Sequence, residues 1–123
     1  MNEAKKEKLK KALNESGLLA PGDSCLDVVE SNYYRALLGP LAGRWLAGKA
    51  YFTQEKFIWQ GWGDDIVIPY SQIRQLEKGF AVIWPIAVKI TYQDDKLCTK
   101  KFSMMGRQKW LDLLSDKAKV PCP

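Results

Sequence analysis

The side chains with the greatest capacity for chemistry in this 123-residue chain are two pairs of adjacent carboxylates. The pairs are Asp64 with Asp65 and Asp94 with Asp95. Paired acids can act as a general acid and base, or can hold a divalent metal ion. Both pairs lie in segments that we expect to be hairpin turns, where aspartate is favoured because it bonds to its local backbone. Turn chemistry therefore accounts for them without a catalytic site.

The other residue types that support catalysis or metal binding are missing or unsuitably spaced. The chain contains no histidine, which removes the commonest general base and the commonest metal ligand. Cys25, Cys98 and Cys122 do not have the C-x-x-C spacing of a zinc site. The glycines of residues 39–43 have neither the spacing nor the lysine of a phosphate-binding loop. We expect no enzyme activity, no metal and no cofactor.

The thiols and the apolar runs indicate where the protein resides. Three widely spaced cysteines, an odd number, are typical of a reducing compartment. Residues 1–17 carry charges where a signal peptide would need an apolar core. The longest apolar run, residues 80–88, is far shorter than the roughly 20 residues of a membrane-spanning helix. These features predict a cytoplasmic protein, with peripheral membrane contact as an option.

The charge of the chain is mildly basic. Lysine and arginine outnumber aspartate and glutamate 19 to 14, which gives a net charge of +5. This excess favours anionic lipid or nucleic acid, although acids and bases are interleaved along most of the chain. Five tryptophans could stack on bases. No predicted strand alternates aromatic and basic residues as a stacking platform does, so the sequence argues against nucleic acid.

The pattern of apolar residues predicts a helix, about seven antiparallel strands and a closing helix. The first helix begins after Asn2 as cap and ends near Gly17; its apolar stripe is thin, so it either packs loosely or lies outside the main core. Ser71 is expected to cap a single helical turn. Strands are predicted at residues 25–38, 44–53, 57–62, 66–69, 73–83, 88–93 and 97–105, and the last helix at 106–119. A mainly β fold, with a bent sheet plugged by the last helix, satisfies these pieces.

Two stretches carry a family resemblance. The first, GRWLAGKAYFTQEKFIWQG, has a strand ending in aromatic-Thr, a short turn with basic Lys56, then an apolar strand. The second, IVIPYSQIRQLEKG, has Ile68, Pro69, Ile73 and Glu77 in an Ile-Pro-x-x-x-Ile-x-x-x-Glu pattern. Together they resemble the GRAM domain and its bacterial relatives in the pleckstrin-homology superfold. The resemblance implies a domain at residues 23–120, preceded by a helix and linker at 1–22, that binds membrane lipids or proteins.

The resemblance also suggests where an anion would bind. Pleckstrin-homology domains that bind phosphoinositides use a basic cluster on their first two strands and the loop between them. The matching candidates here are Arg35, Arg44, Lys49 and Lys56. The tight lysine and arginine pairing of strong phosphoinositide binders is absent. The alternative is that these four are solvated charges on the outer face of the sheet.

Two apolar segments are candidates for contact with a membrane or a partner. In RALLGPLAGRW, Leu37, Leu38, Leu41 and Trp45 lie in or beside a Gly/Pro loop next to arginines, as in a peripheral membrane binder. These leucines can instead fold back over the open end of the sheet. Trp84 is an exposed anchor if it lies at a hairpin tip with Pro85, and a core residue if this run is one buried strand.

The sequence therefore predicts a non-enzymatic binding module. The first option is peripheral association with an anionic membrane surface through the loop at residues 37–45 and nearby bases. The alternative is a protein-protein interaction, including homo-oligomer formation, through an exposed sheet edge or a terminal helix.

Overall fold

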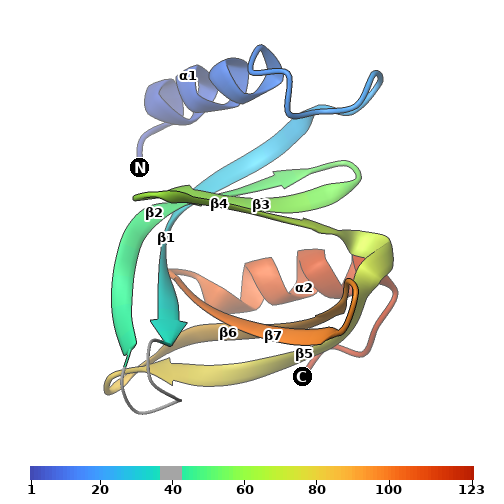
Figure 1. Cartoon of the computed structure of the whole chain (residues 1–123). Helices are drawn as coiled ribbons and strands as arrows, with labels where there is room; N and C mark the ends of the chain where they lie inside the picture. The colour runs from blue at the N-terminus through green and yellow to red at the C-terminus, as the bar shows by residue number, and fades with distance from the viewer. Residues whose placement is uncertain (37–42) are drawn as a thin grey trace.

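The computed structural model describes residues 1–36 and 43–123 and shows one seven-stranded antiparallel sheet with a helix at each end of the chain (Figure 1). The strand order is β4-β3-β2-β1-β7-β6-β5. The mainly β prediction is confirmed. The elements are α1 (Glu3–Asn14), β1 (Cys25–Ala36), β2 (Gly43–Thr53), β3 (Lys56–Gly61), β4 (Asp64–Pro69), the 3-10 turn η1 (Tyr70–Gln72), β5 (Ile73–Ala81), β6 (Trp84–Gln93), β7 (Leu97–Met104) and α2 (Arg107–Ala118).

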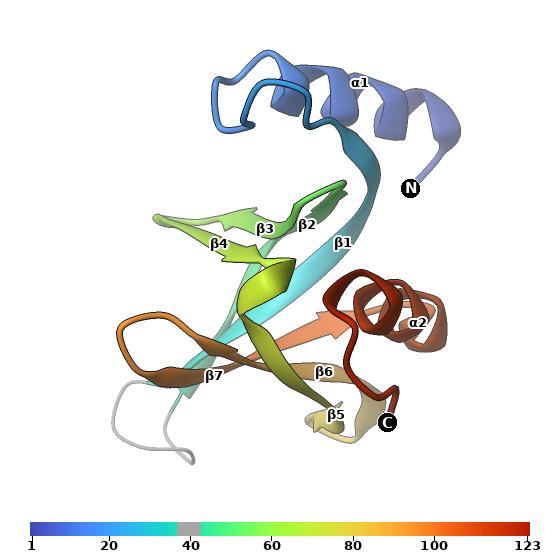
Figure 2. The same cartoon turned by 90° about the vertical axis from the view of Figure 1, so that its right-hand side faces the viewer.

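The sheet bends so that its two halves face each other across the main core, with α2 alongside the opening between them (Figure 2). Strand β1 belongs to both halves, because it pairs with β2 along its length and with β7 near its end. Trp59, Phe57 and Phe102 are fully buried between the halves. Helix α2 adds Trp110, whose ring stacks on Phe52 at 4.8 Å between centroids, and Leu114. The prediction that the last helix plugs the bent sheet is confirmed.

The first helix lies on the other face of the sheet. Asn2 caps it by accepting a hydrogen bond from the Lys5 backbone N–H at 2.8 Å, as predicted. Its one buried side chain is Leu13, which joins a small second cluster formed by Cys25, Val28, Tyr51 and Ile58. Of the two options for this helix, the position outside the main core is confirmed.

Two local predictions, one of a turn and one of a helix cap, are wrong. The β3–β4 turn consists of Trp62 and Gly63, with Gly63 at φ +77°, so Asp64 and Asp65 begin strand β4 instead of forming the turn. A glycine in the left-handed conformation closes this hairpin in two residues, which leaves none for the aspartates. Ser71 lies inside η1 and caps nothing, since Pro69 occupies the cap position.

Strand β5 is shorter than predicted. Strand β5 ends at Ala81 rather than residue 83, because Val82 and Ile83 form the turn into β6. Strand β1 is described from Cys25 to Ala36, and Leu37 and Leu38, the last two residues of its predicted range, lie outside the described residues. The second aspartate pair, Asp94 and Asp95, does occupy the turn between β6 and β7, as predicted. Among the helices of the described ranges, none has the length and apolar character needed to cross a bilayer.

Candidate functional site

The turn between β5 and β6 carries a group of exposed apolar side chains, which we call the apolar tip: Phe80, Val82, Ile83 and Trp84. Their exposed fractions are 59%, 80%, 74% and 63%, respectively. Ala81 pairs with Trp84, so the turn is made of two residues, and Val82 has a positive φ of 59°. A β-branched residue in this conformation costs about 1–2 kcal/mol. Of the two options for Trp84, the exposed position at a hairpin tip is confirmed.

Behind the tip, the outer face of the sheet forms a groove of about 360 Å³ that we call the aromatic groove. Its walls are Tyr34, Trp45, Phe80, Val82 and Lys101. The Tyr34 and Trp45 rings are 5.0 Å apart and inclined at 60°. The Lys101 ammonium lies 5.5 Å from the Tyr34 centroid and 5.6 Å from the Trp45 centroid, within cation–π range of both rings. The groove thus joins aromatic walls to a cation.

Strand register explains why these residues meet. Trp45 is opposite Tyr34, Tyr34 is opposite Lys101, Lys101 is opposite Lys89, and Lys89 is opposite Glu77. Residues that are directly opposite point to the same face of a sheet, so these five side chains form one row across five strands. The row has two adjacent cations at its centre.

The two lysines of the row are close to each other. A Cβ placed on Gly79 would lie 3.3 Å from Lys89 Cε and 3.7 Å from Lys101 Cε, so both side chains extend over this glycine. Burial and the charge of Lys89 lower the pKa of Lys101. None of the ion pairs between described residues includes either lysine, although Glu77 follows Lys89 in the row.

The structure separates the four basic residues that the sequence suggested for anion binding. Arg35 and Arg44 are both exposed and lie opposite each other in the β1–β2 register, at the end of the sheet near the aromatic groove. Lys49 lies opposite Glu30, in the middle of β2. Lys56 lies in the hairpin at the far end of β2, roughly 30 Å from Arg44 along the strand at the usual rise per residue. The Lys56 Nζ donates a hydrogen bond to the Leu18 carbonyl at 3.2 Å.

The apolar candidates divide in a similar way. Trp45 and Trp84 lie at the same end of the molecule, because Trp45 lines the aromatic groove and Trp84 follows the turn that closes it. Leu37, Leu38 and Leu41 lie outside the described residues. The structure therefore joins Trp45 to the β5–β6 hairpin, which the sequence alone did not connect.

A second pocket, of about 400 Å³, opens between β4 and the β6–β7 turn. Its charged residues are Arg35, Lys100, Asp65 and Asp94, two of each sign. Lys100 Nζ donates to the Tyr33 hydroxyl at 3.4 Å. Burial opposes the charged form of Lys100, but the nearby tyrosines outweigh burial and raise its pKa. Because its charges balance, this pocket is a weaker anion site than the end that carries the aromatic groove.

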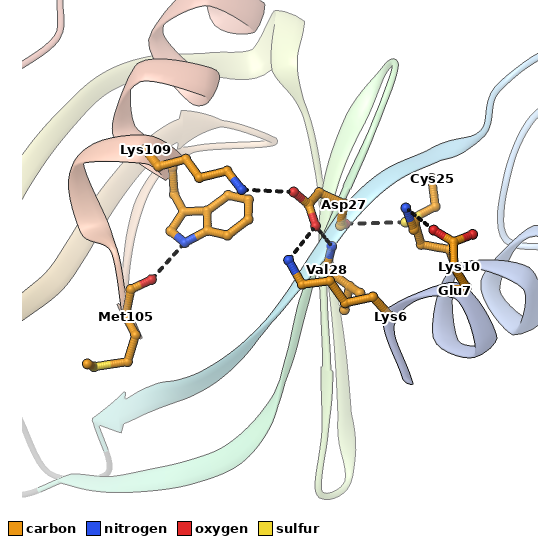
Figure 3. A network of polar contacts seen from close by, with 9 residues as sticks. Lys6, Glu7, Lys10, Cys25, Asp27, Val28, Met105 and Lys109 are labelled. Atoms are coloured by element: carbon orange, nitrogen blue, oxygen red, sulfur yellow. Dashed lines mark hydrogen bonds and ion pairs between the residues drawn. The ribbon is translucent and has the colours of Figure 1, made fainter. Parts of the chain in front are cut away.

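At the end of the molecule opposite the apolar tip, ion pairs connect the two helices to β1 (Figure 3). The Asp27 carboxylate accepts hydrogen bonds from Lys6 of α1 and Lys109 of α2, each at 3.2 Å, and from the Val28 N–H at 2.8 Å. Burial opposes ionisation of Asp27, but these three donors outweigh burial and lower its pKa. Lys109 also lies 4.5 Å from the centroid of Trp110. We call this set the Asp27 network; it ties both helices to β1.

The cysteines do not form a site. Cys25 is buried and its burial raises its pKa to about 11, so it is neutral at neutral pH. Cys122 is exposed and its Sγ donates to Asp112 at 3.3 Å. Among the side chains that the structure describes, no three of cysteine, aspartate or glutamate are placed to hold a metal ion.

Sequence reasoning missed Val82, Ile83, Lys101 and Tyr34 as parts of one site. The signal for the tip was available: Pro85 excludes a continuous central strand through residues 80–88, which favours a turn just before it. The alternation of residues 88–93 also places Lys89 on the outer face. Nothing in the sequence sets the register that brings Lys101 opposite Lys89 and Tyr34.

Comparisons with known proteins extend the description of the fold. No protein-family model and no curated protein matches the chain. Among solved structures, the C-terminal domain of an unknown protein from Leishmania infantum is similar, with a TM-score of 0.67 and 14% identity. The match covers 92% of this chain and 96% of that chain. At this identity the match shows the fold alone.

Proposed function

We propose that this protein is a non-enzymatic module that binds anionic membrane surfaces peripherally through the apolar tip. The observation that carries the proposal is the exposure of three consecutive apolar side chains, Val82, Ile83 and Trp84, at 80%, 74% and 63%. In the free protein this two-residue turn contributes little to folding stability, because its apolar side chains face water and the backbone of Val82 is strained. Insertion into the interfacial region of a membrane would bury them.

The charges near the tip support the same proposal. Arg44 is exposed beside Trp45, and Lys78 is exposed on β5 close to the turn. Each basic residue near an anionic surface adds about 1 kcal/mol of attraction within a Debye length. The net charge of +5 acts in the same direction at longer range. The resemblance to GRAM and pleckstrin-homology domains is consistent with a membrane role, without specifying the lipid.

An alternative is protein-protein interaction or self-association through the edge of the sheet. Strand β4 is an edge strand, Val67 on it is 44% exposed, and Trp62 in the adjacent turn is 86% exposed. Exposed edges of this kind can pair with another strand. This alternative predicts an oligomer that depends on protein concentration and that is lost on Val67→Lys, with no response to lipid.

Flotation with liposomes tests the membrane proposal. Purified protein is mixed with neutral or anionic vesicles at low and high salt, and the floating fraction is measured. We expect binding to anionic vesicles that weakens with salt. Ile83→Ser should reduce binding about tenfold or more, because an inserted isoleucine contributes about 1.5–3 kcal/mol.

Leu97→Ser is the matched control, since Leu97 is 60% exposed at the opposite end of β6 and β7. Neither change alters the net charge, so a difference between the two variants reports apolar insertion at the tip. Equal binding by the wild-type protein and Ile83→Ser would refute the proposal, and so would equal losses from both variants.

A further inference from the structure

We propose that Arg107, the first residue of α2, is a positioning residue that holds the β5–β6 hairpin in the orientation in which the apolar tip meets a membrane. This inference rests on the proposed membrane function and deepens it, because it assigns to the same site a residue that lies outside the tip. Two observations support it: the bond between Arg107 and the base of the hairpin, and the unfavourable place of Arg107 in its own helix.

The side chain of Arg107 connects α2 to the base of the hairpin. Its Nη1 donates a hydrogen bond to the Gly79 carbonyl at 3.0 Å, and the side chain is half-buried. Strand β5 is at the edge of the sheet, so it has a neighbouring strand only on the β6 side. The bond from Arg107 therefore provides a link between the hairpin and the body of the protein that the strand ladder does not provide.

Gly79 lies where the direction of the hairpin is set. The register of β5 with β6 shifts between Gly79 and Ala81, directly before the two-residue turn. An irregularity of this kind bends a strand and re-aims the side chains that follow it. The ladder between β6 and β7 begins at Ala87, so residues 84–86 extend beyond it. A donor bound to the Gly79 carbonyl therefore acts at the point that determines which way the apolar tip faces.

The position of Arg107 is unfavourable for α2 itself. Arg107 follows the cap residue Gly106, whose position provides no side-chain cap, and the first turn of the helix contains no acidic residue. The N-terminal end of a helix carries a partial positive charge, so a cation there is destabilising. None of the ion pairs between described residues includes Arg107. Residues that break a local rule are expected at functional sites, and the bond to Gly79 gives Arg107 such a role.

The bond would favour membrane binding through order in the free protein. Ile83 and Trp84 must be held in one geometry when they insert, and this ordering costs conformational entropy. A hairpin that is already fixed before it meets the membrane avoids part of that cost, so it binds more tightly.

Amide hydrogen exchange of the lipid-free protein tests the positioning role. Arg107→Met removes the bond and one positive charge. The matched control, Lys78→Met, removes one positive charge from an exposed residue of β5 and leaves the bond in place. We expect Arg107→Met to speed the exchange of the amides at residues 79–84 about fivefold, the effect of one lost hydrogen bond, and Lys78→Met to leave it unchanged.

Flotation and urea unfolding separate positioning from charge and from a merely structural role. With anionic vesicles, Arg107→Met should lose about fivefold more affinity than Lys78→Met, because both variants lose one charge but only Arg107→Met loses the hydrogen bond. The urea midpoints of the two variants should be equal, since loss of the bond is offset by removal of a cation from the helix N-terminus. A merely structural arginine would instead lower the midpoint of Arg107→Met.

Three results would overturn the assignment of Arg107: unchanged exchange at residues 79–84, equal losses of flotation from the two variants, or a lowered urea midpoint for Arg107→Met alone. The membrane proposal fails separately, if the wild-type protein does not float. In that event the exchange experiment, which contains no lipid, still decides whether Arg107 orders the hairpin. A wild-type protein that floats, with equal losses from Arg107→Met and Lys78→Met, refutes the role of Arg107 alone.

Discussion

The two ends of this molecule present their side chains to water in opposite ways. At the helix end, the carboxylate of Asp27 is half-buried and accepts hydrogen bonds from three donors, two of them lysines from different helices. At the hairpin end, Val82, Ile83 and Trp84 are exposed although they are apolar. Figure 1 and Figure 2 both place α1 and the β5–β6 hairpin at opposite ends of the fold.

This contrast separates residues that stabilise the fold from residues that are available for binding. The Asp27 network joins α1, β1 and α2, so its loss would loosen three elements. Ile83 and Trp84 of the apolar tip are mostly exposed, so removal of their side chains would change little within the protein. A patch that does not stabilise the fold, and that costs free energy in water, is the better candidate for an interaction surface.

The largest expected effect compares the same substitution at the two ends. Ile58→Ala, at a fully buried residue below α1, should lower the free energy of unfolding by about 2–5 kcal/mol. Ile83→Ala should change it by less than about 0.5 kcal/mol, because Ile83 is 74% exposed. Urea denaturation measures both values. If Ile83→Ala proved as destabilising as Ile58→Ala, the distinction between the two ends would fail.

A smaller effect concerns the pH dependence of the Asp27 network. The pKa of Asp27 is lowered in the folded protein, so its stabilisation is fully present above the unfolded pKa of about 3.9 and is lost as pH falls through the folded pKa. Asp27→Asn should cost about 1–2 kcal/mol at pH 7 and much less at pH 3. Urea unfolding at both pH values measures this difference.

Asp116→Asn is the control for this experiment. Asp116 is exposed on α2, and its replacement should change stability by less than about 0.5 kcal/mol at either pH. A cost of Asp27→Asn that stays constant from pH 7 to pH 3 would show that the carboxylate charge does not hold the helices.

The smallest effect is a reactivity difference between two thiols. Cys25 is buried below α1 with a pKa raised to about 11 by that burial, so little thiolate is present at pH 8. Alkylation followed by mass spectrometry should modify exposed Cys122 at least about 100-fold faster than Cys25. Anionic vesicles should leave the slow rate of Cys25 unchanged if only the hairpin end meets the membrane. Acceleration of Cys25 by vesicles would place α1 at the membrane instead.

Much of the fold could be predicted because its signals are local. The alternation of Val88, Ile90 and Tyr92 indicates a strand with one buried face, and the spacing of Trp110, Leu111 and Leu114 indicates a helix with one buried stripe. The errors were local as well. The prediction of a turn at residues 63–65 is wrong because Gly63, in the left-handed conformation, closes the hairpin together with Trp62.

The candidate site was harder to predict because it depends on pairing between distant strands. The sequence suggests both Trp45 and Trp84 as contact residues, but as members of separate segments. Their connection through Tyr34 and Lys101 rests on the register of β1 with β2 and β7. Register depends on how whole strands match their buried faces, so it cannot be obtained from one segment at a time.

The sequence by itself determined the class of the fold, the order of its elements and the absence of histidine chemistry, because periodicity and composition are properties of the chain alone. Only the tertiary structure decided that Trp84 is exposed, that Lys56 lies far from Arg44, and that Lys101 lies beside Trp45. Exposure and proximity depend on which surfaces pack together, and packing couples residues that are separated by most of the chain.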